Sequence, residues 1–244
     1  DGLREIEEYA FAGCSALSSV RLPESLIWIR EWSFRDCSSL TEIVIPGEQT
    51  NLEPFIFEGC SSLASLSLPA MNRELKYNFG QTAEDIPQTL KKVEITGGTE
   101  IVQNAFSGCS SLENIALPET LTAIGANTFR GCSSLTGLII PDACADIGDN
   151  AFSGCLSLGF LSLPSLENKK LVNLFDYNSG IPASLKTVSV RGGAKVAESA
   201  FAEAAGLEKV VLGEGIASLG TGVFFRCGAL TEVVLPQSLT SIGT

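Results

Sequence analysis

Residues 106–118 read Phe-Ser-Gly-Cys-Ser-Ser-Leu-Glu-Asn-Ile-Ala-Leu-Pro, and this stretch decides the fold. Its frame is a phenylalanine followed by a cysteine, a leucine, an isoleucine, a second leucine and a proline at fixed spacings. The frame recurs, with small departures, from seven other phenylalanines: Phe11, Phe34, Phe57, Phe129, Phe152, Phe201 and Phe224. An internal repeat of this length indicates a solenoid in which each repeat makes one coil.

The spacing of these phenylalanines also reveals two variant coils. The phenylalanines fall into three groups, at positions 11, 34 and 57, at 106, 129 and 152, and at 201 and 224. Successive phenylalanines are 23 residues apart within a group, and 49 residues separate the last of one group from the first of the next. Each longer step hides one further coil, because residues 86–98 closely match residues 181–193 and both segments keep the leucine and strand positions of the frame. The sequence therefore predicts ten coils of 22–27 residues, eight regular and two variant, in a single solenoid domain spanning 1–244.

Each coil reads as two short extended segments joined by turns. Ile43 and Ile45 alternate with polar or variable neighbours, which predicts a strand with one buried face. A second segment, such as 121–124, ends at a glycine that we expect to adopt a positive φ. The glycines at this position are Gly125, Gly148, Gly220 and Gly243. The Phe-x-Gly-Cys stretch predicts a tight helical or 3₁₀ turn, so the fold class is mostly β with short parallel strands.

Stacking the coils should align identical residues about 4.8 Å apart. The phenylalanines would then form an aromatic column at one corner of the solenoid. Phe79 and Phe175 are predicted to take the corner position in the two variant coils, which lack the regular frame. Strand leucine, isoleucine and valine residues would complete a continuous apolar core.

The consensus Phe-x-Gly-Cys-Ser-Ser-Leu-x-x-Ile-x-Leu-Pro-x-x-Leu-x-x-Ile-Gly resembles the BspA-like leucine-rich repeat of bacterial surface proteins, and of some protozoan ones. The resemblance covers essentially all 244 residues. It implies a right-handed leucine-rich-repeat solenoid in a secreted or surface-attached protein. It also implies adhesion, since some members are linked to binding host matrix proteins or other bacteria, and it supplies no catalytic residues.

Composition excludes several function classes. The chain has no histidine, which rules out Ser-His-Asp and Cys-His catalytic sites and histidine-bound metals. A net charge of −12 makes nucleic acid an unfavourable partner. No apolar run approaches the roughly 20 residues of a membrane span. We expect no enzyme activity, no cofactor and no membrane insertion, and we interpret the chain, which begins and ends inside repeats, as a fragment of a longer protein.

The eight cysteines could indicate disulfides or zinc, but their spacing favours buried free thiols. Seven recur at one coil position, where Ala204 replaces cysteine in another coil. Neighbouring coils would bring these cysteines near enough to bridge, yet parallel side chains in a ladder do not point at each other. Asp142, Asp146 and Asp149 could suggest calcium, but they lack the calcium-loop pattern and fit solvated turns better.

Two groups of residues are candidates for ligand binding. The first is an apolar set on the outward face of the main strands, centred on Ile139 and Phe160 and including Val44, Val211 and Val234. The second lies in the variant coils and consists of Lys76, Tyr77, Lys170 and Tyr177. Loops inserted into a solenoid often carry binding, although they can also simply accommodate extra residues. Trp28 and Trp32 are expected only to cover the amino-terminal end or the convex surface.

The leading functional hypothesis is a surface interaction module that binds a protein or glycan, such as a host matrix component or another bacterial surface. The rival hypothesis is a structural stalk that holds another domain away from a cell wall. Exposed aromatic residues gathered on one face would favour binding, whereas a uniformly polar surface would favour the stalk.

Overall fold

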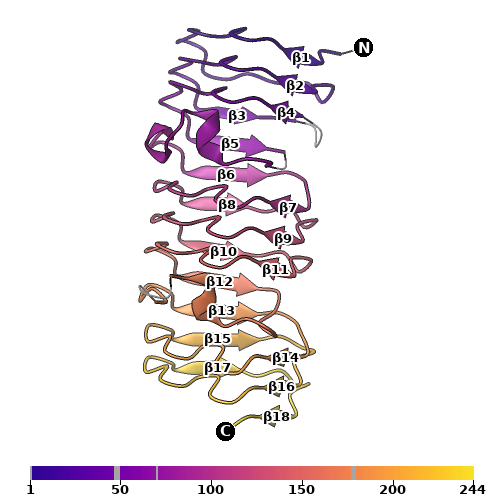
Figure 1. The fold of residues 1–244 in the computed structure, drawn as a ribbon, viewed down its shortest axis with the longest axis vertical. Coiled ribbons are helices and arrows are strands. Elements are labelled where there is room, and N and C mark those ends of the chain that lie inside the picture. The colour runs from indigo at the N-terminus through magenta and orange to yellow at the C-terminus, as the bar shows by residue number, and fades with distance from the viewer. Residues whose placement is uncertain (1, 47–49, 70, 177–179) are drawn as a thin grey trace.

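A computed structural model describes residues 2–46, 50–69, 71–176 and 180–244. The chain forms a parallel β-solenoid of about ten coils with its termini at opposite ends (Figure 1). One column of strands forms the main sheet and a second column of two-residue strands runs beside it. The predicted solenoid, its parallel strands and its small helical content are confirmed.

The main-sheet column is divided into a four-stranded and a five-stranded sheet. Register is strict: Ile43 pairs with Leu66, and Leu66 with Val93 of the first variant coil. Both variant coils therefore keep their main strand. The strands are β3 (Glu42–Val44), β5 (Ser65–Leu68), β6 (Lys92–Ile95), β8 (Asn114–Ala116), β10 (Gly137–Ile139), β12 (Phe160–Leu163), β13 (Thr187–Val190), β15 (Lys209–Leu212) and β17 (Glu232–Val234).

The second column breaks at each variant coil into three sheets of three strands each. These strands are β1 (Glu5–Ile6), β2 (Trp28–Ile29), β4 (Asn51–Leu52), β7 (Glu100–Ile101), β9 (Ala123–Ile124), β11 (Asp146–Ile147), β14 (Lys195–Val196), β16 (Ser218–Leu219) and β18 (Ser241–Ile242). Short 3₁₀ helices occur in the variant coils instead: η1 (Leu75–Asn78), η2 (Ala83–Asp85) and η3 (Leu171–Leu174).

At each break, β4 or β11 becomes an edge strand, and its backbone carbonyls have no following strand to donate hydrogen bonds to them. Arg73 donates through its guanidinium to the carbonyl of Leu52 in β4. Lys169 donates through Nζ to the carbonyl of Ile147 in β11. The two variant coils thus use the same device, a cation on the exposed edge carbonyl, to satisfy a group that would otherwise lose its partner.

The predicted corner column is confirmed. Successive rings from Phe11 to Phe57 stack with centroids 5.1 and 6.0 Å apart, and Phe129 lies 5.6 and 5.5 Å from its two neighbours. Phe79 and Phe175 do take the corner position in the variant coils, but their rings are tilted by 40° and 45° from the preceding phenylalanine. With the strand leucines, isoleucines and valines, these rings form one continuous core.

The turn around the corner phenylalanine of each regular coil has the hydrogen bonds of the predicted 3₁₀ turn but does not continue as a helix, whereas Phe79 and Phe175 directly follow the 3₁₀ helices η1 and η3. Backbone bonds do run from residue i+3 back to residue i, as from Cys109 to Phe106 at 3.1 Å. However, the residues two before and two after the phenylalanine have positive φ, for example 59° at Asn104 and 81° at Gly108. Left-handed residues on both sides interrupt the helix, so the segment forms linked turns.

The prediction of positive φ for the glycines after the second strands was wrong. Gly125 does not lie in the left-handed region, and neither do its equivalents. A Cβ on Gly125 would lie 2.4 Å from the backbone nitrogen of Gln103 in the preceding coil. Glycine is required there because two backbones approach closely, not because of an unusual dihedral angle.

The outward face of the main sheet is also less exposed than predicted. Val44 and Ile139 are exposed, but Ser67 and Ser162 are buried. Arg191 covers Ser162: its guanidinium donates to the Ser162 hydroxyl and to the Ile140 carbonyl, and it reaches Asp142 two coils away. Arg191 reaches from the next coil and buries an outward-facing residue. The alternation of residues within one strand cannot predict such burial.

Candidate functional site

An exposed column of aromatic rings runs along the outside of the first coils. Tyr9 and Trp32 stack with centroids 5.3 Å apart and planes 9° apart, and Trp32 and Phe55 stack at 5.6 Å and 8°. Tyr9 is 48% exposed, and the other two rings are half-buried. We call Tyr9, Trp32 and Phe55 the outer aromatic column, to distinguish it from the buried corner column.

The backbone at these three positions is unusual for aromatic residues. Each lies two residues before a corner phenylalanine, with φ of 59° at Tyr9, 53° at Trp32 and 61° at Phe55. The equivalent left-handed positions elsewhere hold small or amide residues: Asn104, Asn127, Asn150, Ser199 and Gly222. Asparagine and glycine tolerate this conformation, whereas a bulky side chain there costs about 1–2 kcal/mol.

The surroundings of Trp32 fix its orientation. Its indole Nε1 donates a 2.9 Å hydrogen bond to Oε2 of Glu58 in the next coil. The other oxygen of Glu58 lies 3.4 Å from the guanidinium of Arg35. The ring is therefore held in place by the coil after it, as well as by its two stacking neighbours.

Two of the predicted site residues lie at the end of this column. Tyr77 stands two residues before Phe79, is 36% exposed and belongs to η1. Lys76 places its Nζ 5.1 Å from the centre of the Tyr77 ring and 2.8 Å from a carboxylate oxygen of Glu74. The Glu74 carboxylate raises the pKa of Lys76, so this lysine is charged but already paired.

The other two predicted variant-coil residues do not form an equivalent arrangement in the described chain. Lys170 is exposed and lines a hollow of about 500 Å³ with Val172, Ser199 and Glu203. Tyr177 lies outside the described residues. The position two before Phe175 is Asn173, whereas the first variant coil has Tyr77 there. The two variant coils therefore differ at the position two before the corner phenylalanine, although the sequence predicts a similar ligand-binding loop in both.

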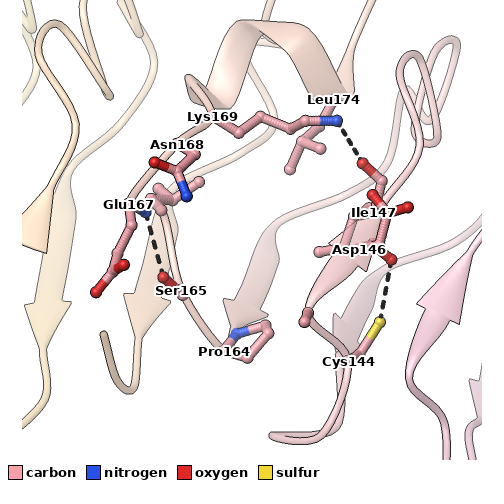
Figure 2. A pocket seen from close by; sticks show the side chains of 11 residues that line it. Cys144, Asp146, Ile147, Pro164, Ser165, Glu167, Asn168, Lys169 and Leu174 are labelled. Atoms are coloured by element: carbon pink, nitrogen blue, oxygen red, sulfur yellow. Dashed lines mark hydrogen bonds between the residues drawn. The ribbon is translucent and has the colours of Figure 1, made fainter. Parts of the chain in front are cut away.

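A second cavity, of about 320 Å³, occupies the place where the second column lacks a strand (Figure 2). It lies between β11 and residues 164–169, with Leu174 of η3 lining it. Figure 2 shows Lys169 reaching across to Ile147; the same Nζ lies 2.9 Å from Oδ1 of Asp149. The cavity's lysine is thus committed to internal contacts, and we interpret this cavity as a consequence of the missing strand.

The predicted apolar set on the main sheet is scattered. Ile139 is 62% exposed, but its neighbour in the next coil is the buried Ser162. Phe160 is half-buried and lies opposite Gly137, diagonally from Ile139. Val211 and Val234 pair with each other two coils further on. The sheet offers separate apolar residues, which are common on any protein surface.

The cysteines are suited to the core and not to nucleophilic chemistry. All eight are free; six are buried, Cys227 is half-buried, and Cys14 in the end coil is exposed, contrary to the prediction of burial at that position. Four of the buried thiols donate to the carbonyl of the corner phenylalanine in the preceding coil, as Cys60 does to Phe34 at 3.1 Å. Burial raises the pKa of Cys60 to about 12 and that of Cys144 to about 11.

The acidic side chains offer little support for a metal site. Asp142 pairs with Arg191 at 2.6 Å and Asp149 pairs with Lys169 at 2.9 Å. Among residues 2–46, 50–69, 71–176 and 180–244, no three histidine, cysteine or acidic side chains gather closely enough to hold a metal ion. Within the same ranges no helix has the length and apolar character to cross a membrane.

Comparison with known families accounts for the whole chain. The family model described as the BspA type leucine-rich repeat region matches in six copies, over residues 1–86, 86–181 and 180–244. No curated protein matches the chain.

Solved leucine-rich repeat structures also match along nearly the full chain. A protein from Bacteroides ovatus is 20% identical, with 99% of this chain and 79% of that chain covered and a TM-score of 0.45. One from Eubacterium ventriosum is 17% identical, covering 99% and 78%, also with a TM-score of 0.45. A leucine rich cell surface protein from Faecalibacterium prausnitzii is 20% identical, covering 96% and 77%, with a TM-score of 0.37.

Proposed function

The chain belongs to the BspA-type leucine-rich repeat family, and from that premise we propose that it is a non-enzymatic surface or secreted module that binds a protein partner through its outer aromatic column. The family supports an interaction or scaffold role, and leucine-rich repeats of this kind are typically non-catalytic. The adhesin-like role, the extracellular location and the single-domain solenoid are part of this proposal.

The observation that carries the proposal is the choice of residue at the left-handed positions. Three coils place Tyr9, Trp32 and Phe55 where five others place asparagine, serine or glycine. Ring stacking contributes about 0.5–1.5 kcal/mol per pair, which at best offsets the conformational cost of about 1–2 kcal/mol per residue. Stacking alone therefore does not account for these residues, whereas residues with a strained backbone are typical of binding sites.

The geometry of the column favours a protein over a glycan as partner. Sugar rings bind against the open face of an aromatic ring, but the Trp32 faces are covered by Tyr9 on one side and Phe55 on the other. What remains is a ridge of ring edges with a hydrogen-bonding tip on Tyr9, since the Trp32 indole N–H is already bonded to Glu58. Tyrosine and tryptophan are the residues most enriched in the energetic centres of protein interfaces.

The stalk remains the second candidate, and the later coils favour it. Their left-handed positions are polar, and ion pairs link neighbouring coils along the sheet, as between Lys91 and Glu113 at 2.6 Å or Lys209 and Glu232 at 2.8 Å. Such ladders suit a rod that keeps its shape, and the apolar side chains exposed in these coils, such as Ile139, Leu156 and Phe225, do not form a stacked column like the one in the first coils. We assign the spacer role to these coils and the binding role to the first ones.

The test is retention of the purified chain on an array of matrix proteins and glycans. The variant carrying Tyr9→Asn, Trp32→Asn and Phe55→Asn should keep its circular dichroism spectrum and lose retention on a protein component. A second variant, with Lys76, Tyr77, Lys170 and Tyr177 all changed to Ser, tests the variant coils, and Ile139→Ser with Phe160→Ser tests the sheet. Equal retention by the column variant and the wild type would contradict the proposal.

A further inference from the structure

A groove lies beside the outer aromatic column and has an acidic lining. It has a volume of about 480 Å³ and lies between the rings of Trp32 and Phe55 and the variant-coil segment 79–85. Its two charged lining residues are both carboxylates, Glu58 and Asp85. Ring edges can pack against the apolar stems of lysine and arginine side chains, while carboxylates attract the charged ends of those side chains.

Both carboxylates are held in position before any partner arrives. Asp85 Oδ2 accepts hydrogen bonds from the Thr82 backbone at 2.8 Å, the Gln81 backbone at 2.9 Å and the Thr82 hydroxyl at 3.0 Å. The bond from the Thr82 backbone lowers the pKa of Asp85 most, so this exposed group is ionised at neutral pH. Pre-organised side chains lose little entropy on binding, which favours affinity.

The two carboxylates differ in how much charge they can offer. Glu58 already binds the Trp32 indole and approaches the Arg35 guanidinium at 3.4 Å, so part of its charge is balanced. Asp85 is bound by neutral donors, and no ion pair with it occurs in the described part of the chain. An incoming cation would therefore meet its strongest attraction at Asp85, with Glu58 holding the ring beside it.

The same end of the molecule carries most of the net negative charge. Residues 1–85 contain 14 acidic and 6 basic residues, a net charge of −8 out of −12 for the whole chain. Such an asymmetry speeds the approach of a positively charged partner and favours its docking at this end.

We propose that this groove binds the lysine or arginine side chains of a basic protein segment, with the apolar stem of the side chain packed along the Trp32 and Phe55 ring edges and its charged end at the Asp85 carboxylate. The inference rests on the proposed function and specifies the partner's chemistry. The rest of the segment would lie along the outer aromatic column toward Tyr9.

The experiment uses hexa-arginine and hexa-citrulline peptides, which have nearly the same shape but differ in charge. Anisotropy of dye-labelled peptides gives affinity for the whole chain at 50 and 300 mM salt. In a Trp28→Phe background, Trp32 is the only tryptophan, so its emission reports whether the peptide reaches the groove. Hexa-arginine should bind and change that emission, and hexa-citrulline should do neither.

Matched variants separate the groove from general electrostatics. Asp85→Asn keeps the amide oxygen as acceptor for the 80–85 loop and should weaken hexa-arginine binding about three- to fivefold, the range expected for an exposed cation site. Trp32→Asn should weaken it similarly. Glu119→Gln removes the same charge from an exposed position in a later coil and should change the affinity less than twofold.

Three outcomes would overturn the inference. Equal weakening by Asp85→Asn and Glu119→Gln would show attraction to net charge only, and equal binding of hexa-citrulline would exclude recognition of a cation. If the array identifies a neutral protein or glycan whose retention needs the column while hexa-arginine fails to bind, the cation site is wrong. In that last case a binding role for the column survives, so the two failures are distinguishable.

Discussion

The coils of Phe11, Phe34 and Phe57 and the coils of Phe106, Phe129 and Phe152 share one backbone and differ consistently at the outward position two residues before the phenylalanine. The left-handed residue two before each corner phenylalanine has a φ of 53–61° in the first group and 56–59° in the second. Their corner rings stack at similar distances. Yet the outward residue is aromatic in the amino-terminal group and asparagine in the central group.

The difference separates what the fold requires from what it tolerates. Asparagine satisfies the left-handed position at low cost, and the central group shows that a regular coil needs nothing larger there. Each group ends in a variant coil, and those differ in the same way, with Tyr77 in one and Asn173 in the other. We therefore assign the repeated positions to stability and the aromatic substitutions to binding.

The largest effect is expected where the two groups are alike, in the corner column. Phe129 is fully buried between two rings, so Phe129→Ala should lower the free energy of unfolding by about 3–5 kcal/mol. Phe11 is only half-buried in the end coil and has one stacking neighbour, so Phe11→Ala should cost less. Urea denaturation measures both, and an equal or larger loss at Phe11 would contradict the stacking model.

The thiols give the next largest contrast, because the same repeat position is exposed at the end and buried inside. Cys14 should react with a thiol reagent at least about a hundredfold faster than Cys60 or Cys155, whose thiolates are disfavoured by burial. Mass spectrometry of partly labelled native protein measures this. Rapid labelling of most of the eight cysteines would contradict the burial.

The same thiols predict a dependence of stability on pH. The pKa of Cys60 is about 12 in the folded chain, above the ordinary value of 9.0. A raised folded-state pKa means that its contribution to stability is complete below pH 9 and is lost as pH rises toward 12. The urea concentration at the unfolding midpoint should therefore decrease as the pH rises from about 9 to about 12, and Cys60→Ala should make that decrease smaller. An unchanged pH profile in the variant would contradict the assignment.

Repetition made most of the architecture predictable from one sequence. Because the same residue types recur at fixed spacing, the ten coils, the corner ring of each coil and the replacements Phe79 and Phe175 could all be found by counting. The outer aromatic column could have been found in the same way, by reading the residue two before each corner phenylalanine. Trp32 considered alone resembles a cover for the end of the solenoid, and the pattern becomes visible only when Tyr9 and Phe55 are aligned with it.

The remaining features depend on contacts between coils, which counting within a coil does not reveal. The role of Gly125 is set by the backbone of Gln103, and the burial of Ser162 is set by Arg191 from the next coil. The loss of the second strand in the variant coils leaves no positive pattern in the sequence. The candidate groove likewise combines Trp32 with Asp85, which belong to different coils.

A smaller effect should follow from exchanging the residues that distinguish the two groups. Asn127→Trp places a bulky ring in a left-handed position flanked by Asn104 and Asn150, so it should cost about 1–2 kcal/mol. Trp32→Asn loses two stacking contacts and the hydrogen bond to Glu58 but relieves the strained backbone, so the net loss of stability should be about 1–2 kcal/mol, below that of a core ring. If Trp32→Asn proved as destabilising as the loss of a core ring, the column would be structural and the binding assignment would lose its basis.

The smallest effect is expected at the breaks that end each group. Lys169→Met and Arg73→Met each remove the cation from an edge carbonyl, of Ile147 and Leu52 respectively, and each should cost about 0.5–1.5 kcal/mol. Water can reach these carbonyls once the side chain is shortened, so the loss stays near the value of one hydrogen bond. The exposed Lys195→Met serves as control and should change the urea midpoint less. If all three variants have the same urea midpoint, the cations do not stabilise the edge strands β4 and β11. The packing of η1 and η3 would then be what stabilises the chain where the second column is interrupted.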